Sequence, residues 1–189
     1  LLIVFLLCLA TLASAQYFPR TGRAAIYQES LDAQGRLDVL SISLRPGYED
    51  LATLAYFRLG KGARVTSVSV TNGEAGESDL HGEYPMHLAG QLREDATKAL
   101  ALIDGGELFL NMQDIPAAPD IEAVRQKWQT DTLRARLAKL ILDTHPDVIL
   151  VARDWLCGPA SAQMQVLETE VTWALRHVES IKSKDPRGV

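Results

Sequence analysis

The sequence predicts an α/β fold, a Rossmann-like parallel sheet with helices on both faces. Short apolar runs alternate with amphipathic segments of about ten residues or more, which is the order of βαβ units. The run at residues 147–151 is apolar after its first residue, as is typical of a strand buried on both faces. A length of 189 residues with 47% hydrophobic residues suits one domain with a sizeable core.

Four strands are expected, at residues 37–44, 65–70, 107–111 and 147–151. Five helices are expected around them, at residues 24–33, 49–59, 91–103, 121–143 and 161–183. Residues 73–90 are rich in glycine and polar groups and are expected to form a long loop. Ligands bind beyond the C-terminal ends of parallel strands. Any site should therefore lie on the loops at residues 45–49, 71–90 and 152–162.

The net charge of −5 comes without a block of like charges or a stripe of Lys and Arg. This pattern argues against nucleic acid or an anionic membrane as the principal partner.

Residues 1–15 are uncharged and strongly apolar, and they end in Ala13-Ser14-Ala15. The run falls short of the roughly 20 residues needed to span a bilayer, so we favour a signal peptide over a transmembrane anchor. Cleavage before Gln16 would leave a secreted or periplasmic chain, with one domain at residues 16–189. The sequence lacks an initiating Met, and we expect the natural chain to extend at both ends. The mature part would hold only Cys157, which cannot form an internal disulfide and is expected to be a small buried side chain.

Two short motifs follow the first two expected strands. Arg45-Pro46-Gly47-Tyr48-Glu49 follows the first, and Thr71-Asn72-Gly73-Glu74-Ala75-Gly76 follows the second. Their order and spacing resemble the PIG-L/LmbE family of zinc-dependent enzymes, which remove N-acetyl groups from N-acetylglucosamine conjugates. In that family the first turn reads His-Pro-Asp-Asp-Glu, so only Pro46 and Glu49 are retained here. The resemblance spans about residues 26–178, and family domains usually continue further.

The resemblance also implies where the zinc and catalytic residues would stand. Arg45 takes the place of a ligand His, Gly47 that of the base and Tyr48 that of a ligand Asp. After the fourth strand the family carries a motif like His-Gly-His-His-Gln, where this chain has Gly158-Pro159-Ala160-Ser161-Ala162-Gln163. Pro159 and Ala162 are thus further degenerate metal positions. A cationic Arg repels a metal and the other side chains are poor ligands or none, so no zinc is expected despite the family's use of it.

Two residues of the first turn have alternative interpretations. Arg45 is expected to be a solvated loop residue, although it could bind an anion or a sugar hydroxyl. Glu49 is expected to be a helix N-terminal carboxylate stabilised by the helix dipole. It could instead orient a substrate or hydrogen-bond the loop.

None of the histidines is expected to bind metal. His81 and His87 fall in the expected loop without a carboxylate pattern, His145 ends a helix and His177 lies on the last helix.

Other residues match the family well enough to suggest a ligand site. Asn72 and Glu74 could hydrogen-bond sugar hydroxyls, and Arg93 matches an Arg that contacts substrate in the family. Tyr48 could add an aromatic wall for a sugar ring. Asn72 and Glu74 are equally compatible with a glycine-rich turn that has no ligand.

Three functions fit these observations. The first is a secreted pseudo-deacetylase that binds a glycan, such as an N-acetylated sugar, or a protein partner without catalysis. The second is a working zinc deacetylase with replacement ligands from residues 73–90 or from beyond Val189. The third is a structural domain of a longer secreted protein. The missing motifs favour the first.

Overall fold

The computed structural model describes residues 21–75, 85–115, 120–153 and 161–184. The expected signal peptide, His81, Cys157 and Pro159 lie outside these residues.

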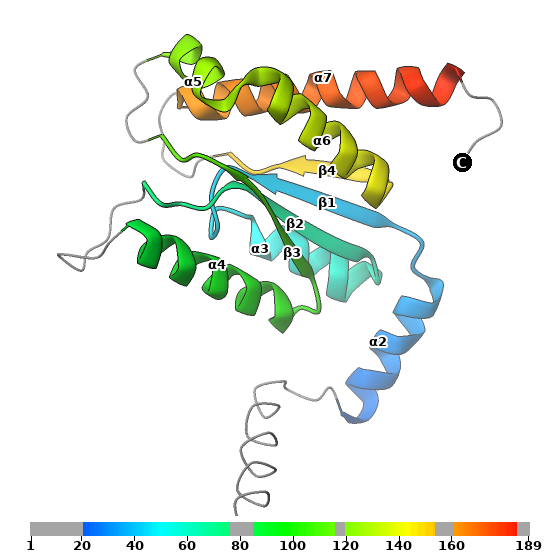
Figure 1. Cartoon of the computed structure of the whole chain (residues 1–189). Helices are drawn as coiled ribbons and strands as arrows, with labels where there is room; N and C mark the ends of the chain where they lie inside the picture. The colour runs from blue at the N-terminus through cyan, green and yellow to red at the C-terminus, as the bar shows by residue number, and fades with distance from the viewer. Residues whose placement is uncertain (1–20, 76–84, 116–119, 154–160, 185–189) are drawn as a thin grey trace, which may run out of the picture.

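The described residues form one sheet of four parallel strands. These are β1 (Asp38–Ser43), β2 (Arg64–Thr71), β3 (Gly106–Met112) and β4 (Val148–Val151), in the order β3-β2-β1-β4. Ser41 of β1 lies beside Ser67 of β2 on one side and Leu150 of β4 on the other. The four expected strands are confirmed, and they all run in the same direction, so that their C-terminal ends lie at one edge of the sheet (Figure 1).

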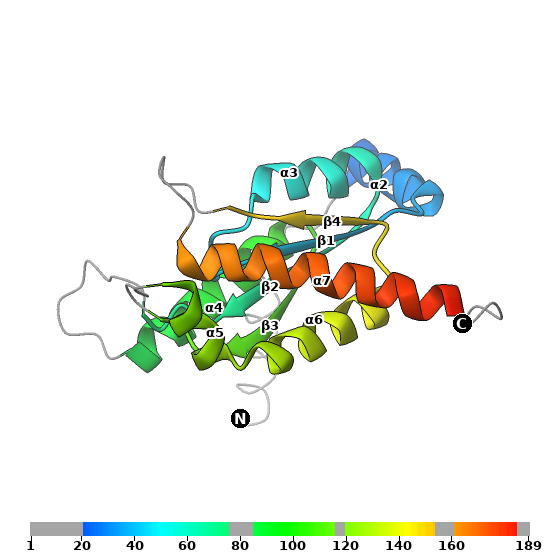
Figure 2. The ribbon, with the colours of Figure 1, turned by 90° about the horizontal axis from the view of Figure 1, so that it is seen from above.

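Helices cover both faces of this sheet. Helices α3 (Leu51–Ala55) and α4 (Pro85–Leu102) lie on one face, and α5 (Ile121–Trp128), α6 (Thr130–Thr144) and α7 (Ala162–Lys184) lie on the other (Figures 1 and 2). Helix α2 (Gly22–Gln34) leads into β1 from the opposite end of the sheet (Figure 1). The predicted fold class is confirmed. None of these helices is both long enough and apolar enough to span a bilayer.

The core has two parts because successive side chains of a strand point to opposite faces. The larger part lies between the sheet and the helices α5 to α7, and its buried members include Leu40, Ile42, Leu44, Val68, Val70, Trp128, Leu133, Leu137, Met164 and Leu167. The smaller part lies on the α3 and α4 side and comprises Val39, Leu54, Ala63, Val65, Leu100 and Ile103. Farther along that face the strands carry Ser41, Ser43, Ser67 and Ser69, each at most 2% exposed. This face is therefore apolar at one end and polar toward the loops.

The helix expected at residues 49–59 is wrong at its start and in its second half. Asp50 caps α3 by accepting a hydrogen bond from the backbone N–H of Thr53 at 3.1 Å. After Ala55 the chain continues as a π-helical turn, η1 (Tyr56–Gly60). This turn brings the buried Arg58 into ion pairs with Asp32 and Asp104, contacts that local helix propensity does not reveal.

The loop expected at residues 73–90 is also wrong in its last part, because α4 begins at Pro85. Proline suits the first turn of a helix, where its missing N–H is not needed. Gly90 lies inside the helix rather than marking its start.

One helix was expected over residues 121–143, whereas the structure has two. Gln129 separates α5 from α6 and adopts a left-handed backbone with φ 49°. The preceding Trp128 is 1% exposed, and its indole N–H donates to the carbonyl of Gln113 at 2.7 Å. Tertiary packing of Trp128 thus accompanies a break that the apolar stripe did not predict.

Candidate functional site

The turn after β1 is held by its own groups. Gly47 has φ 85°, a conformation that favours glycine, and its N–H donates to Glu49 Oε2 at 2.8 Å. Glu49 is 9% exposed. Its carboxylate therefore hydrogen-bonds the loop, while the capping role at α3 belongs to Asp50.

Arg45 is not the solvated residue that the sequence suggested. Its Nε lies 2.8 Å from Asp114 Oδ2, with side-chain exposures of 19% for Arg45 and 0% for Asp114. Its Nη1 also donates to Tyr48 Oη at 3.4 Å. Burial lowers the pKa of Arg45, but the attraction of Asp114 and the contact with Tyr48 outweigh this effect, so the pKa is raised and the guanidinium stays charged. The turn after β1 is thereby locked to the segment after β3.

Asp114 also joins that segment to the loop after β2. Its Oδ2 accepts a hydrogen bond from the N–H of Ala75 at 3.3 Å, and its own N–H donates to Glu74 Oε1 at 2.9 Å. A connected chain of polar contacts thus runs from Tyr48 through Arg45 and Asp114 to Glu74. It spans the C-terminal ends of three strands, where a site was expected.

Three of the residues predicted from the sequence line one pocket. Asn72, Glu74 and Arg93 share a pocket of about 450 Å³ with Met86, Ala89 and Gly90 of α4. The loop after β2 supplies two of the polar side chains and α4 supplies the third. Whether they bind a ligand stays a prediction.

Arg93 is oriented before any ligand arrives. Its Nη1 donates to Asn72 Oδ1 at 2.8 Å and to Asn111 Oδ1 at 2.7 Å. Its guanidinium carbon lies 4.0 Å from the ring centroid of Phe109, in a cation–π contact. These contacts fix one edge of the guanidinium.

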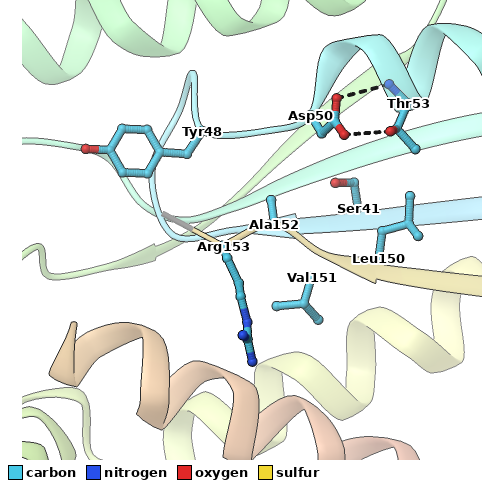
Figure 3. Close-up of a pocket in the computed structure, with 8 residues that line it drawn as sticks. All are labelled: Ser41, Tyr48, Asp50, Thr53, Leu150, Val151, Ala152 and Arg153. Atoms are coloured by element: carbon cyan, nitrogen blue, oxygen red, sulfur yellow. Dashed lines mark hydrogen bonds between the residues drawn. The ribbon is translucent and has the colours of Figure 1, made fainter. Parts of the chain in front are cut away.

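Tyr48 lies at a different pocket from Asn72, Glu74 and Arg93. That second pocket, of about 430 Å³, is lined by Ser41, Tyr48, Asp50, Thr53, Leu150, Val151, Ala152 and Arg153. Figure 3 shows Ser41 and Leu150 on the α3 side of the sheet, with Tyr48 at one end. Arg153 points to the other face, where its Nε donates to Glu168 Oε1 of α7 at 2.6 Å. The structure therefore does not join Tyr48 to the other three residues as an aromatic wall.

Glu107 is a carboxyl group near this site whose pKa is strongly altered, and it was not recognised from the sequence. Burial raises its pKa to about 7; the hydroxyls of Ser67 and Ser69 oppose this shift, and the nearby charge of Glu49 adds to it. Ser69 Oγ donates to Glu107 Oε1 at 2.8 Å, whereas Glu107 Oε2 is buried and has no hydrogen-bond partner within the part of the chain that the structure describes. The carboxyl thus changes charge near neutral pH.

The residues at the implied metal positions do not fit zinc. A catalytic zinc needs about three His, Asp, Glu or Cys ligands. Arg45 places a cation at one such position, and Asp114, the nearest buried carboxylate, already balances that cation. Gly47 and Ala162 carry no donor atom in their side chains. Among the described residues, no group of three or more His, Cys, Asp or Glu could hold a metal ion.

Comparison with known proteins identifies the family of this chain. The family model described as GlcNAc-PI de-N-acetylase, PIG-L, matches residues 51–157. The chain belongs to the PIG-L family. No curated protein sequence matches it.

Solved structures share the fold of this PIG-L chain. The N,N'-diacetylchitobiose deacetylase from Pyrococcus horikoshii has a TM-score of 0.58 at 18% identity, over 74% of this chain and 49% of its own. The A40926 pseudoaglycone deacetylase Dbv21 has 0.54 at 18%, over 75% and 60%. GalB, the 4-carboxy-2-hydroxymuconate hydratase from Pseudomonas putida KT2440, has 0.55 at 19%, over 73% and 55%. The chain therefore spans about half to three fifths of each of these proteins.

At this identity the likeness to these three structures concerns the fold alone. Because one of the three is described as a hydratase, the PIG-L fold by itself does not fix the reaction.

The sequence did not identify as site residues the partners that hold the site together. Asp114 matched the family without an assigned role, and neither Asn111 nor Phe109 was singled out. Asn111 and Asp114 lie at the C-terminal end of β3 or just after it, which is the signal that could have indicated them. Two described histidines lie apart from this site: His145 ends α6 with φ 46°, and His177 stacks on Trp173 with ring centroids 4.7 Å apart. His87 was expected in a loop, but it lies on α4 between Met86 and Ala89, which line the pocket.

Proposed function

We propose that this PIG-L domain binds an N-acetylated sugar or glycoconjugate without hydrolysing it. One observation carries the proposal. Asn72, Glu74 and Arg93 gather around one pocket, while the turn that would supply metal ligands holds the Arg45–Asp114 ion pair. The binding part of the family's cleft thus has a geometry suited to a ligand, and the hydrolytic part does not.

The polar groups of this pocket suit sugar hydroxyls. Each hydroxyl both donates and accepts, and the pocket offers carboxylate and amide oxygens from Glu74 and Asn72 beside the guanidinium of Arg93. Its volume of about 450 Å³ lies in the usual range for small-molecule sites. The exposed Met86 adds an apolar wall.

The absence of hydrolysis follows from the groups that the chain offers. Amide hydrolysis of this kind needs an activated water and a carboxylate to take its proton. Gly47 stands where the family has that base, and Arg45 engages the buried Asp114. We further propose that the domain is exported, as the apolar segment at residues 1–15 suggests.

The test is a titration of purified protein with N-acetylglucosamine oligomers, followed by heat of binding and by acetate release. Wild type should bind saturably and release no acetate. Arg93→Met should weaken binding by about tenfold or more, since it removes a charged donor. Lys98→Met on the same helix is the matched control, because Lys98 is 60% exposed and pairs with the exposed Glu94. It should leave binding unchanged.

Two other outcomes of this titration would favour the two alternative functions. Acetate release that persists through purification would favour a working deacetylase with replacement ligands. A wild type that binds no sugar would favour a structural domain.

A further inference from the structure

Glu74 has an unmet need for a hydrogen-bond donor. Its Oε1 accepts from the N–H of Asp114 at 2.9 Å, but its Oε2 is buried and has no partner among the described residues. A buried carboxylate oxygen without a donor costs free energy, more than a neutral acceptor would. Because Glu74 lines the pocket, a ligand can supply the donor.

The cations nearest to Glu74 are already engaged. Arg45 pairs with Asp114, and Arg93 bonds the amide oxygens of Asn72 and Asn111 while it covers the Phe109 ring. Arg93 and Glu74 share the pocket, yet among the described residues no ion pair joins them. Among the described residues, the pocket therefore presents a carboxylate that no ion pair balances.

We infer that the preferred ligand of this pocket is a sugar that carries a free ammonium group, a de-N-acetylated amino sugar. Its ammonium would lie against Glu74 and its hydroxyls against Asn72 and Arg93. An acetamido group offers Glu74 a single neutral N–H, whereas an ammonium offers three donors and a full positive charge. This inference rests on the proposed sugar-binding function and assigns the pocket a preference for the de-N-acetylated form of the sugar over the N-acetylated form.

The test compares glucosamine oligomers with N-acetylglucosamine oligomers of equal length, at about pH 6, where the amine carries its proton. Wild type should bind the glucosamine oligomer at least about tenfold more tightly, as one charge-assisted hydrogen bond provides. Glu74→Gln keeps an oxygen that can accept from Asp114 N–H but loses the charge. It should reduce the ratio of the two affinities to about one, because the loss of the charge weakens binding of the glucosamine oligomer more than binding of the N-acetylated oligomer.

Two controls separate this site from general attraction of cations to an acidic protein. Glu94→Gln makes the same substitution at an exposed carboxylate on α4 and should preserve the preference. An oligolysine of equal charge should not compete with the glucosamine oligomer. Circular dichroism of Glu74→Gln checks its folding, and the wild-type comparison of the two oligomers tests the idea even if that variant does not fold.

The results distinguish a failure of this inference from a failure of the proposed function. Saturable binding of both oligomers with equal affinity, or a preference for the acetylated one, overturns this inference and leaves the proposed function standing. A preference that survives in Glu74→Gln, or that oligolysine removes, also overturns it. Binding of neither oligomer overturns both.

Discussion

Glu107→Gln should stabilise the protein at neutral and alkaline pH and leave it nearly unchanged in mild acid. Burial raises the pKa of Glu107 from its ordinary 4.5 to about 7. Each tenfold change in proton affinity corresponds to about 1.4 kcal/mol, so ionising this carboxyl in the folded protein costs about 3 kcal/mol. Glutamine keeps an oxygen to accept from Ser69 Oγ and cannot ionise.

The direction of the pH dependence of stability follows from the protons that the folded and unfolded states bind. Between pH 4.5 and about 7 the folded state holds a proton on Glu107 that the unfolded state has released, so wild-type stability falls as the pH rises. Below this window both states are protonated, and above it both are ionised. The difference in unfolding free energy between Glu107→Gln and wild type should therefore grow across the window and then level off.

Urea unfolding at several pH values from about 4.5 to 8 measures this difference, because the other titrating groups cancel between the two proteins. Glu94→Gln is the matched control: Glu94 is exposed and pairs with Lys98, so no comparable pH-dependent gain is expected. A difference between Glu107→Gln and wild type that stays constant with pH would refute the reasoning, since Glu107 would then ionise as an ordinary carboxyl.

Three further predictions concern the turns and the implied metal. Arg45→Met should cost about 3–5 kcal/mol in urea unfolding, since Asp114, at 0% exposure, loses its counter-charge; a cost below about 1 kcal/mol would contradict a buried pair. Gly73→Ala should destabilise by about 1–2 kcal/mol, because φ is 74° and a Cβ would approach Leu92 Cδ1 to 2.7 Å. The helical Gly90→Ala, whose Cβ meets nothing within 4 Å, should instead stabilise by about 0.5–1 kcal/mol, and the opposite ranking in thermal melts would be evidence against the strain. Zinc should neither raise Tm nor remain after dialysis, because Arg45, Gly47, Tyr48 and Ala162 lack a ligand set; one zinc per chain by elemental analysis would disprove this.

The order of strands and helices could be read from the sequence because it depends on local periodicity. The apolar run at residues 147–151 predicted β4, and the short apolar segment at residues 37–44 predicted β1. The same periodicity failed at Gln129, where the apolar stripe continues from α5 to α6 although the backbone breaks. An apolar stripe indicates which face of a helix is buried, but it does not indicate whether the helix axis bends.

The candidate site was predictable in part. Asn72, Glu74 and Arg93 were identified from short motifs, and the structure brings them to one pocket. Tyr48 belongs to the same turn as Pro46 and Glu49, but it lines the other pocket. The direction of a side chain in a tight turn depends on the backbone geometry of the turn, which the sequence motif does not reveal.

The sequence by itself determined the α/β class and the strand ends that bear the loops, because these depend on residue type and spacing. Only the tertiary structure decided what the residues of these loops contact. Arg45 and Asp114 lie 69 positions apart in the chain. Their ion pair exists because the parallel strands β1 and β3 bring their C-terminal ends to the same edge of the sheet. The raised pKa of Glu107 has the same origin: it depends on the side chains of β2 and the turn after β1 that bury the carboxyl, none of which is near it in sequence.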